Sequence, residues 1–208
     1  MNGEIVLSDL DLAALLCSRV CHDVISPVGA ITNGLELLEV EDDESMREMA
    51  MDLVRKSARQ ASAKLQFCRI AFGAAGSAGS MIDMGEAGDV ARAFVGEEKV
   101  KLEWQAPREN RPKAEVKLVL NMMLLGIAGI PRGGKVSVGV DGGGFVVRAE
   151  GDQARVPEKI AEVISGATNG QELDARLVQP YYSKRLAASA GLTLSMALDD
   201  GAVVVRAV

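Results

Sequence analysis

The chain contains 208 residues, of which 48% are hydrophobic and 25% are charged, and its formal net charge is -6 at pH 7. At roughly 100 to 200 residues per domain, this length suits one large or two small domains with an adequate hydrophobic core. A nucleic-acid surface needs clustered lysine and arginine, so the interspersed charges and the negative total argue against direct binding of nucleic acid.

The first residues show no sign of export or membrane insertion. They lack a basic region, and no uninterrupted apolar run in the chain approaches the roughly 18 residues of a membrane span. The cysteines Cys17, Cys21 and Cys68 are odd in number and lie within helical patterns, so we expect reduced thiols. We therefore expect a soluble, cytoplasmic protein that contacts no membrane.

A first helix is predicted to begin after Ser8, which with Asp11 three residues later resembles a capping box. Its apolar positions alternate steps of three and four, the heptad pattern of a helix packed in a bundle. These positions are Leu10, Ala13, Cys17, Val20, Val24, Pro27 or Val28, Ile31, Leu35 and Leu38.

A second helix follows a polar break at residues 41–44, where Asp42 or Asp43 can cap it. Its predicted apolar stripe is Met46, Met49, Leu53, Ser57, Gln60 or Ala61, Lys64, Cys68 and Phe72. The two helices make an αα-hairpin that leaves apolar faces uncovered, so we expect a homodimer in which two hairpins form a four-helix bundle. This hairpin domain spans residues 1–72. The small, flexible sequence GAAGSAGS at residues 73–80 is the linker to a second domain, residues 81–208.

His22 is the only histidine of the chain. The predicted seam places it on the opposite side of the first helix, exposed to solvent, with Arg19 and Ser26 about one turn away. Small and apolar residues around it predict a docking surface for another protein; they are Leu15, Ser18, Ile25 and Gly29. Pro27 lacks a backbone N–H and should bend the helix just past His22. The alternative is an exposed histidine without a role beside a tolerated proline.

The pattern His22-Asp23-x-x-Ser26-Pro27-x-x-Ala30-Ile31 favours a role for the histidine. It resembles the H-box of dimeric sensor histidine kinases, on the first helix of their dimerisation hairpin. The resemblance implies that His22 is phosphorylated on a ring nitrogen, that Asp23 orients the ring or accepts its proton, and that Ser26 lines the reaction surface. Arg19 either neutralises phosphoryl charge or pairs with a carboxylate.

The second domain mixes helices and antiparallel strands in an order that predicts an α+β layer sandwich. Helices are expected at residues 86–95, 114–128, 157–165 and 171–190, and strands at 100–105, 136–140, 145–148, 192–198 and 202–207. The strand pairs around Asp141-Gly142-Gly143-Gly144 and Asp199-Asp200-Gly201 are predicted hairpins.

Residues 118–138 resemble the N-box region of histidine kinase catalytic domains, with Asn121 at an early asparagine. Leu125, however, stands where that family has its metal-binding asparagine, and residues 146–157 lack an Asp-x-Gly-x-Gly box. Residues 129–136 only approximate a phosphate-binding loop, because Val136 replaces the Ser or Thr and the segment runs from helix to strand. The resemblance therefore implies the fold without ATP, and no cofactor or metal is expected in the chain.

A kinase-like hairpin joined to a catalytic-like domain without an ATP site resembles the ChpT-type histidine phosphotransferases of alphaproteobacterial phosphorelays. The resemblance implies that His22 takes a phosphoryl group from the receiver aspartate of a hybrid histidine kinase and passes it to a response regulator. Mg²⁺ is then expected in the partner receiver domain. The alternatives are a divergent autophosphorylating sensor kinase and a scaffold that docks receivers without transfer.

Overall fold

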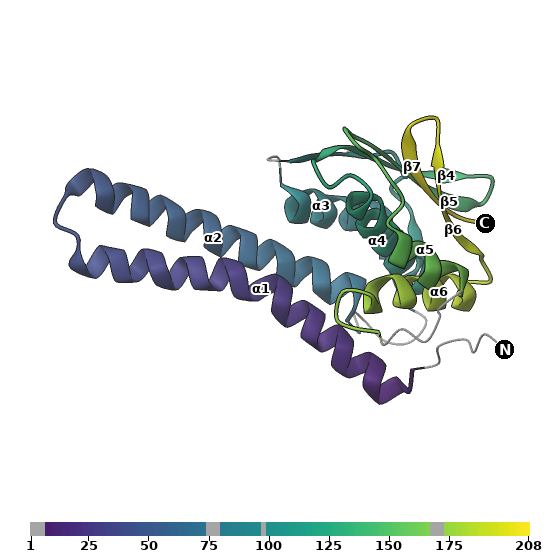
Figure 1. Ribbon diagram of the computed structural model, residues 1–208, viewed down its shortest axis with the longest axis horizontal. Helices are drawn as coiled ribbons and strands as arrows, with labels where there is room; N and C mark the ends of the chain where they lie inside the picture. The colour runs from purple at the N-terminus through teal and green to yellow at the C-terminus, as the bar shows by residue number, and fades with distance from the viewer. Residues whose placement is uncertain (1–6, 74–79, 97–98, 167–172) are drawn as a thin grey trace.

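The computed structural model describes residues 7–73, 80–96, 99–166 and 173–208. Helices α1 (Asp9–Val40) and α2 (Glu44–Ala71) form a long antiparallel hairpin that projects from an α+β part of the molecule (Figure 1). The side chain of Ser8 caps α1 by accepting the N–H of Asp11, and Asp43 caps α2 by accepting the N–H of Met46. The predicted hairpin is thus confirmed, with Asp43 as the second cap.

The hairpin is held together by small residues. A side chain at Gly34 of α1 would meet Val54 and the carbonyl of Ala50 on α2, and Ala50, Ser57 and Ala61 are buried along α2. In the first half of α2, the large apolar residues of the predicted stripe flank this contact line and stay exposed in the single chain, so they are not what packs against α1. The exposed members of that stripe are Met46, Met49 and Leu53.

Five strands form the sheet of the α+β part, in the order β2-β4-β5-β7-β6. They are β2 (Val100–Trp104), β4 (Gly134–Asp141), β5 (Gly144–Glu150), β7 (Ala202–Ala207) and β6 (Leu194–Asp199). The β2–β4 pair is parallel and the other pairs are antiparallel. Gly142, Gly143, Asp200 and Gly201 have the positive φ values that tight hairpin turns require, so both predicted hairpins are confirmed.

Four helices gather against one face of this sheet (Figure 1). They are α3 (Met84–Val95), α4 (Lys113–Ala128), α5 (Glu158–Ser165) and α6 (Val178–Ser189). The apolar helix α4 is buried along most of its length and contacts β4, β5 and β7. A short ribbon of β1 (Met81–Asp83) and β3 (Asn110–Pro112) was not predicted. The predicted α+β sandwich is confirmed.

The helix predicted at residues 171–190 begins later than expected. Residues 174–177 form a turn, in which the Asp174 carboxylate accepts the backbone N–H groups of Arg176 and Leu177. Residues 171 and 172 lie outside the described residues. Pro180 falls in the first turn of α6, where a missing N–H breaks no helical bond, so it does not interrupt the helix.

The hairpin and the α+β part share one hydrophobic core. Phe67, Ile70 and Ala71 near the end of α2 are buried in it, and the Phe67 ring stacks on Phe94 of α3 with centroids 4.0 Å apart. The predicted linker lies largely at residues 74–79, outside the described residues, so the domain boundary stays a prediction. The shared core fixes the base of the hairpin against the α+β part.

Helix α1 is long and apolar enough to cross a membrane by length and mean hydropathy, which counting uninterrupted apolar runs did not reveal. Its middle nevertheless carries Arg19, His22 and Asp23, and ionised groups at the centre of a bilayer are costly. An apolar face on a helix of an αα-hairpin has a second explanation in helix packing. We favour that explanation.

Candidate functional site

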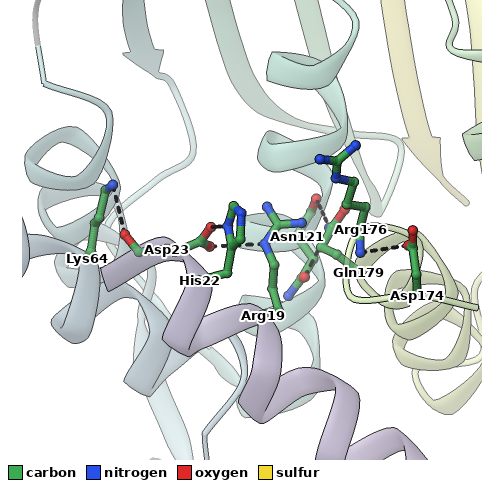
Figure 2. A network of polar contacts seen from close by, with 8 residues as sticks. All are labelled: Arg19, His22, Asp23, Lys64, Asn121, Asp174, Arg176 and Gln179. Atoms are coloured by element: carbon green, nitrogen blue, oxygen red, sulfur yellow. Dashed lines mark hydrogen bonds and ion pairs between the residues drawn. The ribbon is translucent and has the colours of Figure 1, made fainter. Parts of the chain in front are cut away.

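His22 projects from α1 into solvent, and its side chain is 75% exposed. The heptad pattern predicted this orientation. The ring lies above the base of the hairpin, on the side where the segment preceding α6 approaches α1 (Figure 2). An incoming protein can therefore reach the imidazole.

Asp23 faces one ring nitrogen of His22 and is itself held by Arg19. Its Oδ1 lies 3.6 Å from Nδ1 of His22, and its Oδ2 accepts a hydrogen bond from Nε of Arg19 at 3.0 Å. Both Asp23 and Arg19 are mostly buried, so this carboxylate stands in a defined place beside an exposed ring. Arg19 thus pairs with a carboxylate, one of the two roles that its position predicted.

Lys64 of α2 joins the site through the backbone. Pro27 cannot donate to the carbonyl of Asp23 four residues earlier, and Nζ of Lys64 donates to that oxygen instead at 2.9 Å (Figure 2). Helix α1 continues through Pro27 and changes direction part-way along its length (Figure 1). In the sequence, Lys64 falls on the predicted apolar stripe of the second helix, which gives it no polar partner. The carbonyl left free by Pro27 was the signal that could have identified its role.

Cys68 is buried close to the charged side chains of Arg19, Asp23 and Lys64. Burial, followed by the negative charge of Asp23, raises the pKa of the Cys68 thiol to about 11. Cys68 is therefore protonated at neutral pH and unsuited to act as a nucleophile. All three cysteines are free thiols, as predicted.

The predicted docking residues surround His22 on the outer side of α1. Ser18, Ile25 and Gly29 are exposed, with the Ile25 side chain among the most exposed apolar ones, and Leu15 is half-buried. Ser26 is exposed on the next turn after His22. The space around Gly29 is open enough that a Cβ there would touch nothing. These residues share one accessible face, while their docking role stays a prediction.

The α+β part closes the other side of the site. A hollow of about 370 Å³ lies between α1 and the turn before α6; its lining residues are Arg19, His22, Asp23, Asp174, Ala175 and Arg176. Asp174 and Arg176 were not predicted as site residues, because their segment falls within the helix expected at residues 171–190. Their proximity to His22 depends on a contact across more than 150 residues, for which the sequence pattern carries no signal.

A buried polar network occupies the region that resembled a nucleotide-binding motif. Asn121 of α4 donates to the carbonyl of Ala71 at the end of α2 at 3.1 Å, and Gln179 of α6 donates to the Asn121 side chain at 3.1 Å. Leu125, at the position of the expected metal ligand, is fully buried in the core. Burial lowers the pKa of Lys117, which donates to Tyr182 at 3.2 Å. The network joins α2, α4 and α6.

Within the described residues, no group of three or more His, Cys, Asp or Glu side chains is arranged to hold a metal ion. The chemistry available beside His22 is that of an accessible imidazole, a carboxylate at one ring nitrogen and two nearby guanidinium groups. Such a site suits transfer of an anionic group to and from the other ring nitrogen. The fold and the site together describe a class, proteins that present a histidine on a helical hairpin for phosphoryl transfer.

Comparisons with known proteins identify the family. Residues 84–202 match the model of the histidine phosphotransferase C-terminal domain. The protein phosphotransferase ChpT of Brucella abortus (strain 2308) is 52% identical over 200 residues, 94% of either chain. A solved 1.7 Å structure of a bacterial phosphotransferase matches with a TM-score of 0.90 and 48% identity over 99% of both chains. The chain therefore belongs to the histidine phosphotransferase family, and the predicted class of protein is confirmed.

Proposed function

We propose that this protein relays phosphoryl groups between receiver domains, with His22 as the residue that carries the group. The observation that carries the proposal is the exposed His22 ring with Asp23 placed at Nδ1, 3.6 Å away. Because Asp23 occupies the Nδ1 side, Nε2 is the nitrogen directed at a partner. Membership of the histidine phosphotransferase family supports the same assignment.

In the proposed step, neutral His22 attacks the phosphorus of an aspartyl phosphate on a hybrid-kinase receiver. An Nε2–P bond forms as the P–O bond breaks, and the aspartate carboxylate leaves with the bonding electrons. Nδ1 keeps its proton, and the positive charge on the ring faces the Asp23 carboxylate. The reverse step, onto a response-regulator aspartate, empties His22 again.

The receiver supplies the Mg²⁺ for this chemistry, and the phosphotransferase uses no ATP. We place the protein in the cytoplasm as a homodimer, with two hairpins side by side in a four-helix bundle. Exposed apolar side chains on both helices support the dimer; they include Val28, Leu35, Met49, Leu53 and Leu65. A groove at the base of the hairpin, lined by Ala13, Leu16 and Val20 among others, adds to the face that a second copy would cover.

The decisive experiment uses a receiver domain phosphorylated with radiolabelled acetyl phosphate and then freed of the reagent. Mixed with this protein and Mg²⁺, it should transfer an acid-labile, alkali-stable label that the His22→Gln variant cannot accept. Because His22 is the only histidine, such a label has one possible location. Failure of wild-type protein to take label from any cognate receiver would contradict the proposal.

The same assay separates the two alternatives. Labelling of His22 by ATP alone would identify an autophosphorylating kinase. A His22→Gln variant that retained full relay function with purified partners would identify a docking scaffold.

A further inference from the structure

The α+β part reaches the phosphoryl-transfer site through a turn whose position is fixed. Oδ1 of Asp174 accepts the backbone N–H groups of Arg176 at 2.8 Å and of Leu177 at 2.9 Å. Leu177 is buried in a small apolar cluster with Val163 and Tyr181. The turn is therefore held in place by its own hydrogen bonds and by the burial of Leu177.

The same cluster ties the turn to α1. Leu7, just before α1, and Leu12 in its first turns pack against the cluster, and the N–H of Leu7 donates to the Tyr181 hydroxyl at 3.1 Å. An exposed ion pair between Arg185 of α6 and Asp9 of α1 also joins these parts of the molecule. The turn is thus held against the helix that carries His22, ten residues after Leu12.

Arg19 and Arg176, the two arginines that line the hollow beside His22, differ in whether a carboxylate pairs with them. The Arg19 guanidinium is paired with Asp23 at 3.0 Å. Arg176 is exposed, and within the part of the chain that the structure describes its guanidinium forms no hydrogen bond or ion pair. The Asp174 carboxylate is engaged by backbone N–H groups, and its pKa is lowered chiefly by that of Leu177 and to a lesser degree by the nearby charge of Arg176. Arg176 is therefore the cation available to an incoming anion.

A phosphoryl group on the imidazole would bring nearly two negative charges into this hollow. Its oxygens match the planar fork of a guanidinium, which binds phosphate groups in a bidentate manner. Asp23 lies on the same side as Nδ1, so charge on Nε2 has to be neutralised from elsewhere. Figure 2 places Arg176 and His22 on two different elements that face the same space.

We propose that Arg176 binds the phosphoryl group of phosphorylated His22, so that the α+β part completes the site by contributing an anion-binding residue. The inference rests on the proposed function and adds a residue to it. It gives the α+β part a direct role at the reacting group, in addition to any surface that it offers to a receiver.

The test measures the equilibrium distribution of phosphoryl groups between a receiver and this protein, for wild type, Arg176→Gln and Arg176→Lys. Because equilibrium depends on the stability of phosphohistidine and not on docking, loss of the phosphoryl contact lowers the phosphorylated fraction of His22. We expect the transfer equilibrium constant to fall about fivefold in Arg176→Gln, the size expected of one partly exposed ion contact. Arg176→Lys should recover part of the loss.

Arg132→Gln is the matched control, because Arg132 is exposed and does not line the hollow. It should leave the equilibrium constant unchanged, and circular dichroism should show all variants folded. An Arg176→Gln variant with slower transfer but an unchanged equilibrium constant would overturn the inference and make Arg176 a receiver-docking residue. Unchanged rate and equilibrium would overturn it outright. Wild-type protein without label would instead contradict the proposed function.

Discussion

Pro27 and Lys64 show how a helix accommodates a missing backbone N–H close to His22. A proline inside a helix removes one hydrogen bond and leaves a carbonyl unpaired, a costly arrangement when that carbonyl is partly buried. Lys64 donates to the Asp23 carbonyl at 2.9 Å and so supplies the hydrogen bond that Pro27 cannot. Asp23, beside His22, is therefore held through both its side chain and its backbone.

A double-mutant cycle tests this pairing. Lys64→Met should lower the free energy of unfolding by about 1 kcal/mol, because the Asp23 carbonyl loses its donor. In a Pro27→Ala background the helical N–H is restored to that carbonyl, so the same Lys64→Met change should cost clearly less. Urea unfolding of the four proteins measures both values. Equal costs in the two backgrounds would contradict the pairing.

Cys68 provides a second test at the level of one residue. With a pKa of about 11, roughly one Cys68 thiol in a thousand is ionised at pH 8, and only the thiolate alkylates readily. Iodoacetamide should therefore modify Cys68 much more slowly than the exposed Cys17 and Cys21, and its rate should rise about tenfold per pH unit toward pH 11. Peptide mass spectrometry of quenched samples measures this. The guanidinium-unfolded chain is the control, in which the three cysteines should react at similar rates.

At the scale of the elements, the sequence was informative wherever a pattern was long and local. The caps at Ser8 and Asp43 and the glycine-containing hairpin turns follow from residues within a few positions of one another. The three-residue strands β1 and β3 are too short to carry a periodic pattern and were missed. Residues 174–177 were predicted as helix but form a turn. The Asp174 side chain accepts backbone N–H groups there and so competes with helical hydrogen bonding.

The residues of the candidate site likewise separate into those that a local pattern predicts and those that depend on long-range contacts. His22, its exposure and its neighbours on α1 follow from one helix, so the heptad predicted them. Lys64 lies 41 residues from its partner Asp23 in the chain, and Arg176 lies farther still from His22. Contacts of that kind are set by how α1, α2 and the turn before α6 pack, which periodicity does not encode.

The buried network that joins α2, α4 and α6 is a set of mutually dependent hydrogen bonds. Gln179→Leu would remove the donor to Oδ1 of Asn121, and Asn121→Leu would remove the side-chain donor to the Ala71 carbonyl. Each change should lower the free energy of unfolding by about 2 kcal/mol, because an unpaired buried polar group bears its full desolvation cost. Urea denaturation measures both.

The double variant Asn121→Leu with Gln179→Leu is the sharper measurement. Because both partners are then apolar, its cost should be well below the sum of the two single costs. Additive losses would mean that the two side chains act independently, against the network described above.

For the whole molecule, the distribution of apolar side chains predicts its assembly. The close contact of α1 and α2 uses small residues, while larger ones such as Leu35 and Leu53 stay about half exposed on the hairpin. Exposed apolar surface of this extent on a helical hairpin is stabilised when a second hairpin covers it. The α+β part lies at the base of the hairpin, where α2 ends in its core, and leaves the rest of the hairpin free (Figure 1).

Size-exclusion chromatography with light scattering should therefore give wild-type protein twice the 21.9 kDa mass of one chain. Leu35→Glu combined with Leu53→Glu places charges on the face to be buried, and should shift the protein to a monomer because unpaired charges oppose burial. Leu198→Glu is the matched control, since Leu198 is equally exposed but lies on β6, away from the hairpin; it should stay dimeric. A wild-type monomer, or a double variant that remained fully dimeric, would show that this face is not the interface.

A monomeric double variant also shows whether phosphoryl transfer needs the dimer. Because His22 and Arg176 line one hollow within a single chain, we expect the monomer to accept label at a rate within about threefold of wild type.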